Sequence, residues 1–154
     1  MATERSNLVS LLKRTFEKEA WHGPSVTEAL ADIEAREATW RLSNTHSIIE
    51  LVLHMTAWRE YVIQKLAGNA SYSVTEEHNF PAGHNWPESV QRLRENQQKL
   101  VSALESFPGD LQDQVPGKTA PLSFYTLVHG IIHHDLYHTG QIMLIKKAGR
   151  AQTI

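Results

Sequence analysis

Apolar side chains recur every three or four residues through four long segments of the chain, the spacing that gathers them on one face of an α-helix. The segments cover residues 4–20, 47–68 and 87–107, and a last one that follows Pro121 and extends to Lys147. Strict alternation of apolar and polar residues, which would indicate strands, is nearly absent. The pattern therefore predicts an all-α four-helix bundle, formed by a single domain over residues 1–154.

Capping residues and helix breakers predict where the second and third of these helices begin and end. Ser47, followed three residues later by Glu50, forms a capping-box sequence, and Gly68 is a typical stop at a helix C-terminus. Pro87 suits the first position of the third helix, and Pro108 follows its last apolar residue. We therefore expect both helices to have well-defined ends.

The connecting segments also carry recognisable signals. The break His22-Gly23-Pro24 ends the first helical pattern, and Ser25 with Glu28 predicts a short, capped helical segment. Residues 34–45 show no clean period and are interpreted as a connection with some helical character. Residues 69–86 form a long polar loop punctuated by glycine, proline and asparagine. A loop of this length inside a compact domain is often functional.

The last predicted helix is apolar on nearly all of its faces. Such a helix is either central in the bundle or covered on its far side by a second subunit. The pattern therefore favours a homodimer. The apolar positions concerned are Leu127, Val128, Ile131, Ile132, Leu136, Ile142, Met143, Leu144 and Ile145.

The same helix carries two pairs of histidines with a spacing of four. Residues that are four apart lie one above the other on a helix, so His134 and His138 share one face. His129 and His133 form a second pair, which points more than roughly 90° away from the first. We expect at most one pair to bind a metal ion and select His134 and His138.

A divalent ion held by two histidines requires further ligands, and His54 is the best candidate for the third. It lies within the second helix on a mostly apolar face, where an unpartnered imidazole would be costly to bury. Three neutral histidines leave the ion its full charge and an open coordination position, as in catalytic zinc sites. The alternative interpretation is that the histidines are buried and hydrogen-bond to neighbouring helices or to a subunit interface.

Three further polar residues lie close to these histidines in sequence. Asp135 completes a His-Asp-x-x-His pattern and is the candidate general base, although it could instead orient a neighbouring group. Gln141 lies on the ligand face, where it orients a ligand or a bound water, or is simply a satisfied polar group of the core. Glu50 could accept a hydrogen bond near His54, but its capping role explains it without a metal.

The sequence says less about where the remaining histidines and the tryptophans lie. Histidines in breaks and loops are solvated by default, and any of them could line a cleft: His22, His78 and His84. The tryptophans are expected in the core or at its rim: Trp21, Trp40, Trp58 and Trp86.

Composition narrows the function further. The chain has no cysteine, which excludes disulfides, thiolate metal ligands and cysteine nucleophiles. The net charge of −2 and the absence of a basic run argue against nucleic acid or an anionic membrane as a partner. The charged N-terminus lacks the apolar region of a secretory signal, and no apolar run is long enough to span a membrane. We therefore expect a soluble, cytoplasmic protein.

Three segments resemble the DinB/YfiT-like family of metal-dependent enzymes: WHGPSV at 21–26, HSIIELVLHMTAWREYV at 46–62 and HGIIHHDLYHTGQIMLIKKA at 129–148. The resemblance implies a four-helix bundle, commonly dimeric, with a divalent metal such as nickel or zinc on three histidines. The matching positions are His54, His134 and His138. Some members of the family are transferases or isomerases that use low-molecular-weight thiols such as bacillithiol or mycothiol, and others are labelled hydrolases.

These observations lead to one functional hypothesis with an alternative. We expect a metal-dependent enzyme in which the three histidines hold a nickel or zinc ion that activates a thiol, as in an S-transferase, or a water, as in a hydrolase. The substrate is an unidentified small molecule. The alternative is a dimeric metal-binding stress-response protein without enzymatic activity, whose histidines tie the bundle together.

Overall fold

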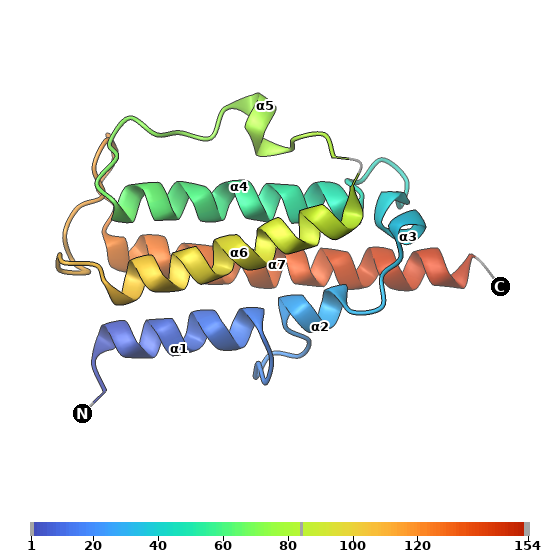
Figure 1. Cartoon of the computed structure of the whole chain (residues 1–154), viewed down its shortest axis with the longest axis horizontal. Coiled ribbons are helices and arrows are strands. Elements are labelled where there is room, and N and C mark those ends of the chain that lie inside the picture. Colours follow the sequence, from blue (N-terminus) through green and yellow to red (C-terminus); the bar gives the residue numbers. More distant parts are fainter. Residues whose placement is uncertain (1, 84, 153–154) are drawn as a thin grey trace.

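The computed structural model describes residues 2–83 and 85–152, and within them the chain is helical without any strand. In chain order the helices are α1 (Glu4–Phe16), α2 (Val26–Leu30), α3 (Ala35–Thr39), α4 (Ile48–Leu66), α5 (Glu76–Asn79), α6 (Trp86–Glu105) and α7 (Phe124–Ala151). The four long helices form the bundle: α4 and α1 each pack against both α6 and α7 (Figure 1). This architecture confirms the predicted all-α four-helix fold.

Local capping signals correctly predicted the start of α2 and α4. The main-chain N–H of Ser47 donates to the Glu50 carboxylate at 2.8 Å, and Ser25 makes the same bond to Glu28. After α4 the chain leaves the helix at Gly68, where a φ of 84° suits glycine. Glu50 therefore serves the cap of α4, as its position in the sequence indicated.

Several helix boundaries differ from the predicted ones. The first helix ends at Phe16 rather than near residue 20, because the side chains of Ser25 and Thr27 donate to the carbonyl of Glu17 and turn the chain back. The third long helix begins at Trp86, one residue before Pro87, with Asn85 as its cap. The bond from Ser25 to Glu17, which ends the first helix, joins residues eight positions apart, and such a bond leaves no signal in helical periodicity.

The core consists of two apolar clusters separated by a polar layer halfway along the bundle. One cluster packs the half of α4 that contains Tyr61 and Val62, and the other the half that contains Val52 and Met55. Between them lie the buried side chains of Arg59, Gln97 and Asp135. These polar residues come from three different helices, and Arg59 donates a hydrogen bond to each of the other two.

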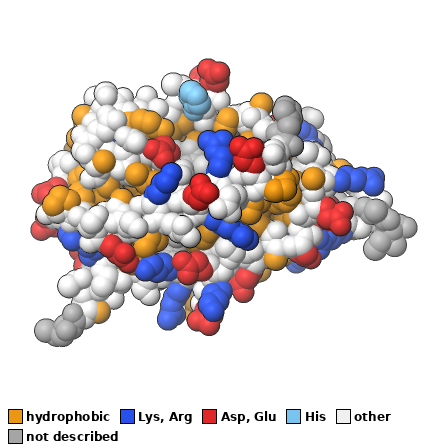
Figure 2. Space-filling model, viewed as in Figure 1, with side chains coloured by type: hydrophobic (Ala, Val, Ile, Leu, Met, Phe, Trp, Pro, Cys, Tyr) orange, Lys and Arg blue, Asp and Glu red, His pale blue; other side chains and the backbone are white. Residues whose placement is uncertain are grey.

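The surface shows acidic and basic side chains mixed with one another on the face presented in Figure 2. Among the described residues, no helix combines the length and the apolar character needed to cross a membrane. The tryptophans do not all lie where we expected. Trp86 is buried, whereas Trp21 is completely exposed in the turn between α1 and α2, which corrects its placement in the core or at its rim.

Candidate metal centre

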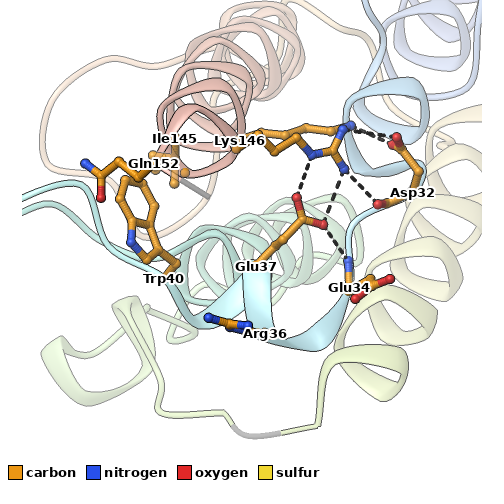
Figure 3. Close-up of a pocket in the computed structure, with 10 residues that line it drawn as sticks. Asp32, Glu34, Arg36, Glu37, Trp40, Ile145, Lys146 and Gln152 are labelled. Atoms are coloured by element: carbon orange, nitrogen blue, oxygen red, sulfur yellow. Dashed lines mark hydrogen bonds and ion pairs between the residues drawn. The ribbon is translucent and has the colours of Figure 1, made fainter. Parts of the chain in front are cut away.

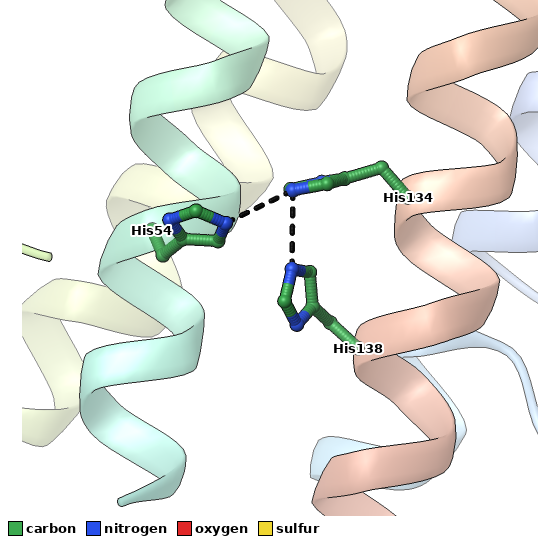
Figure 4. Close-up of side chains that lie close together, drawn as sticks. All are labelled: His54, His134 and His138. Carbon is green, nitrogen blue, oxygen red and sulfur yellow. Dashed lines mark hydrogen bonds between the residues drawn. The ribbon is translucent and has the colours of Figure 1, made fainter. Parts of the chain in front are cut away.

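The three selected histidines meet between α4 and α7. His54 projects from α4, and His134 and His138 project from successive turns of α7 (Figure 4). The Nε2 atom of His134 lies 3.0 Å from that of His54 and 3.1 Å from that of His138. Candidate ligand atoms of all three side chains lie within 4.8 Å of one another. This group could hold a metal ion.

Two of these histidines are oriented by hydrogen bonds from their outer nitrogens. His54 Nδ1 lies 2.6 Å from the main-chain carbonyl of Asn79, and His138 Nδ1 lies 2.6 Å from Gln141 Oε1. A carbonyl oxygen only accepts, so each Nδ1 carries the hydrogen and donates it. In the neutral rings the Nε2 atoms then present lone pairs to the centre, which is the tautomer that a metal ion requires.

The arrangement without a cation leaves the centre imperfectly satisfied. His54 and His138 both present acceptors to the Nε2 of His134, which can donate a hydrogen to only one of them. The Nδ1 of His134 is buried and has no hydrogen-bond partner among the described residues. Converging lone pairs of this kind repel one another, and a divalent cation would relieve the repulsion. The residues therefore fit a metal ion held by three imidazoles.

Burial also keeps these rings neutral. Desolvation lowers the pKa of His134 to about 3 and that of His138 to about 4, and it lowers the pKa of His54 as well. Nearby positive charge also lowers the pKa of each ring: that of the other two histidines and Arg59 for His134, that of His46, among others, for His138, and that of His46 for His54. At neutral pH the histidines are therefore unprotonated and available as ligands.

The carboxylate of Asp135 is engaged elsewhere. Its Oδ2 accepts a hydrogen bond from Arg59 Nη2 at 2.6 Å, and both side chains are completely buried. Arg59 also donates to the carbonyl of Met55 and to Gln97 Oε1. Burial raises the pKa of Asp135, whereas the Arg59 charge acts to lower it. Among the described residues, the hydrogen bond of Asp135 is to Arg59 and not to a histidine of the cluster.

Sequence reasoning missed Arg59, Asn79 and Phe80. Phe80 stacks on the ring of His54, with centroids 4.1 Å apart, and on its other face it stacks on His46 at 3.7 Å. The length of the loop predicted a functional segment, but nothing in the sequence singled out these two loop residues. For Arg59 a signal existed, because a charged residue stands one turn from Met55 within the apolar part of α4.

The other histidines of the described residues do not belong to the cluster. The rings of His129 and His133 are tilted against one another with centroids 5.9 Å apart, and Tyr125 packs on His129. His22 is exposed, and His78 is exposed beside Thr75, to which it hydrogen-bonds. His84 lies outside the described residues.

No histidine of the cluster lines any of three cavities formed by the described residues. One, of about 580 Å³, lies beside Trp40 at the C-terminal end of α7, where Arg150 is ion-paired with Asp32 and Glu37 (Figure 3). A second, of about 770 Å³, lies between α4, α6 and the loop after α4, and a third, of about 290 Å³, lies beside Met143. His54 and His138 are buried, whereas His134 is partly exposed.

Comparison with known proteins agrees with the geometry of this site. The family model of the DinB superfamily matches residues 20–142, which include all three histidines of the cluster and the loop after α4. No curated protein and no solved structure matches the chain. By this match over most of its length, the chain belongs to the DinB superfamily.

Proposed function

We propose that the protein is a metal-dependent enzyme in which His54, His134 and His138 hold a nickel or zinc ion and a thiol is activated for transfer to a small substrate. The observation that carries this proposal is the convergence of three Nε2 atoms, two of which belong to rings whose Nδ1 donates away from the centre. When bound, the ion would lower the pKa of a coordinated thiol or water.

The surroundings of Asp135 favour thiol transfer over hydrolysis. Hydrolysis of a substrate by an activated water is helped by a nearby general base. The candidate base, Asp135, would have to leave Arg59, and the buried guanidinium would then remain unpaired. A thiolate requires no such base once it has lost its proton to solvent. A low-molecular-weight thiol is therefore our proposed cofactor, and hydrolysis with Asp135 as the base is the second version of the enzyme.

The first test is the metal content of protein purified without an affinity tag. We expect about one equivalent of a divalent metal per chain, lost in His134→Ala because two imidazoles hold the ion far less tightly than three. His133→Ala is the matched control, since it removes a neighbouring, exposed histidine from the same helix. Absence of metal from both the wild type and the control after incubation with nickel or zinc would refute the proposal.

The second candidate function is a metal-binding protein without enzymatic activity. The burial of His54 and His138 favours it, because neither of these side chains lines one of the three cavities described above. The two candidates differ in whether a thiol reaches the metal. In the cobalt-substituted protein, an enzyme of the proposed kind gains an intense near-ultraviolet absorption from thiolate coordination when a small thiol is added. An unchanged spectrum would favour the non-enzymatic function.

We also propose that two copies of the chain associate through the outer face of α7. Tyr137 and Leu144 lie two turns apart on this face and are 65 % and 61 % exposed. Exposed Trp21 belongs to the turn whose residues Ala20 and Gly23 share a cavity with Met143 of α7. Large apolar side chains gathered in this way are typical of an interface.

A further inference from the structure

Asn79 makes two hydrogen bonds at the edge of the histidine cluster, and it accepts in both. Its side-chain Oδ1 accepts from the indole Nε1–H of Trp58 at 2.9 Å. Its main-chain carbonyl accepts from His54 Nδ1–H at 2.6 Å. Trp58 and His54 are one helical turn apart on α4, so a single loop residue binds two successive turns of the helix.

We propose that Asn79 is a positioning residue: its side chain latches the α5 segment to Trp58, and this holds its carbonyl where it fixes the tautomer of His54. The inference rests on the proposed metal centre and extends it to the loop. With the hydrogen kept on Nδ1, the Nε2 lone pair of His54 always faces the centre. Without the latch, the hydrogen could occupy Nε2 and block the ligand atom.

The α5 segment has few other anchors close to His54. The helix consists of four residues, and none of their side chains is buried. Phe80 stacks on the ring of His54 with an interplanar angle of 6°, which fixes the plane of the ring. A stacked ring is not a hydrogen-bond acceptor for Nδ1–H, however, so it does not select the tautomer. Phe80 therefore fixes the plane of the His54 ring, and the adjacent Asn79 determines which ring nitrogen carries the hydrogen.

Close packing of the loop on α4 supports this assignment. Gly83 lies so near Leu53 that a Cβ on Gly83 would stand 2.3 Å from Leu53 Cδ1. The loop therefore lies directly against the helix on the C-terminal side of Asn79. A shift of a fraction of an ångström there would lengthen the 2.6 Å bond that selects the tautomer.

The test removes the latch from either partner. Asn79→Ala removes the acceptor, Trp58→Phe removes the donor while keeping an aromatic ring, and Asn79→Asp retains an acceptor oxygen. We expect nickel or zinc to bind about 10- to 100-fold more weakly in Asn79→Ala and in Trp58→Phe, the usual effect of losing a group that orients a ligand. The double variant should lose no more than either single variant, because both remove the same bond. Asn79→Asp should retain most of the affinity.

Long-range ¹H–¹⁵N NMR of the imidazoles in metal-free protein gives a readout that a merely structural role would not change. We expect His54 to hold its hydrogen on Nδ1 in the wild type and in Asn79→Asp, and to become a mixture of tautomers in Asn79→Ala. The matched control is Asn69→Ala, which removes hydrogen bonds to Gln64, Ser71 and Tyr72 at the start of the same loop. This control should change neither the tautomer nor the affinity.

An unchanged His54 tautomer in both Asn79→Ala and Trp58→Phe would overturn the proposal, whatever their metal affinity. An equal loss of affinity in Asn69→Ala would also overturn it, because any loosening of the loop would then suffice. Failure of the wild type to bind nickel or zinc would instead refute the proposed function. The tautomer of the metal-free protein distinguishes this outcome from failure of the latch.

Discussion

The ion pair between Arg59 and Asp135 is the most consequential single contact that lies outside the histidine cluster. Removing one partner of a buried pair leaves a charge in a medium that solvates it poorly. We expect Arg59→Met to lower the free energy of unfolding by about 3–5 kcal/mol. The double variant Arg59→Met/Asp135→Leu should recover most of this loss, because it leaves no unpaired charge. Urea unfolding of the three proteins measures both values.

Equal stability of the single and double variants would contradict this account of the pair.

The same reasoning limits the use of Asp135→Asn as a test of the general base. That variant also leaves Arg59 without a charged partner, so part of any loss of activity would come from unfolding. Activity must therefore be expressed per folded molecule. A folded Asp135→Asn protein with full activity would exclude the base role.

The depressed pKa values of the clustered histidines predict how the stability of the metal-free protein depends on pH. Above the ordinary pKa of about 6.5, His134 and His138 are neutral in both the folded and the unfolded chain. Below pH 6.5 the two side chains take up protons in the unfolded chain. In the folded protein they stay neutral until the pH approaches their pKa values of about 3 and 4. The unfolded state then binds more protons, so stability falls as the pH falls.

We therefore expect the urea midpoint of metal-free protein to decrease between pH 7 and pH 5, a range that lies above the pKa of ordinary carboxylates. The control is the double variant His134→Ala/His138→Ala, which should lose most of this slope. His129→Ala/His133→Ala, which removes the other pair from the same helix, should retain it. An identical slope in all three proteins would show that other groups cause the pH dependence.

At the residue scale, the sequence predicted which histidines meet but not what holds them. The pair on α7 follows from the helical period, and His54 follows from its apolar surroundings. The hydrogen bonds that Asn79 accepts and that Arg59 donates were not predictable in the same way. Arg59 meets a partner 76 positions away, and Asn79 acts on His54 through a main-chain carbonyl, which every residue type possesses.

At the scale of elements, local chemistry predicted helix starts better than helix ends. A capping box is formed by residues three positions apart, so Ser25 and Ser47 directly predicted where α2 and α4 begin. The end of α1 depends instead on bonds that reach back from Ser25 and Thr27 to Glu17. Helix ends that are set by contacts between segments leave no trace in local periodicity.

The loops illustrate the same limit. Gly117, in the loop between α6 and α7, has a φ of 77° and lies so close to the loop after α4 that a Cβ would stand 2.1 Å from the carbonyl oxygen of Ala70. Lys65 donates to that same oxygen at 2.8 Å. The two long loops therefore pack together at one end of the bundle. Their composition predicted that they were loops, but it did not predict that they touch.

At the scale of the molecule, the polar layer explains why a site can exist inside an apolar bundle. The two apolar clusters stabilise either end of the four long helices, and the layer between them combines Arg59, Gln97 and Asp135 with the nearby histidines. The helical period predicted an apolar face on each long helix, but it did not predict that the buried residues form two separate clusters. Which polar side chains pair within the layer depends on how the helices are turned relative to one another.

For the whole molecule, we predict dimerisation through the outer face of α7. If two copies associate there, Leu144→Glu places a charge in the interface without disturbing the interior of the folded chain, because Leu144 is 61 % exposed. We expect the wild type to sediment as a dimer at micromolar concentration and Leu144→Glu as a monomer of unchanged helical content. Leu11→Glu is the matched control, since Leu11 is also a half-exposed leucine, at 47 %, but lies on α1. A wild-type monomer, or a dimer that Leu144→Glu leaves intact, would exclude this face as the interface.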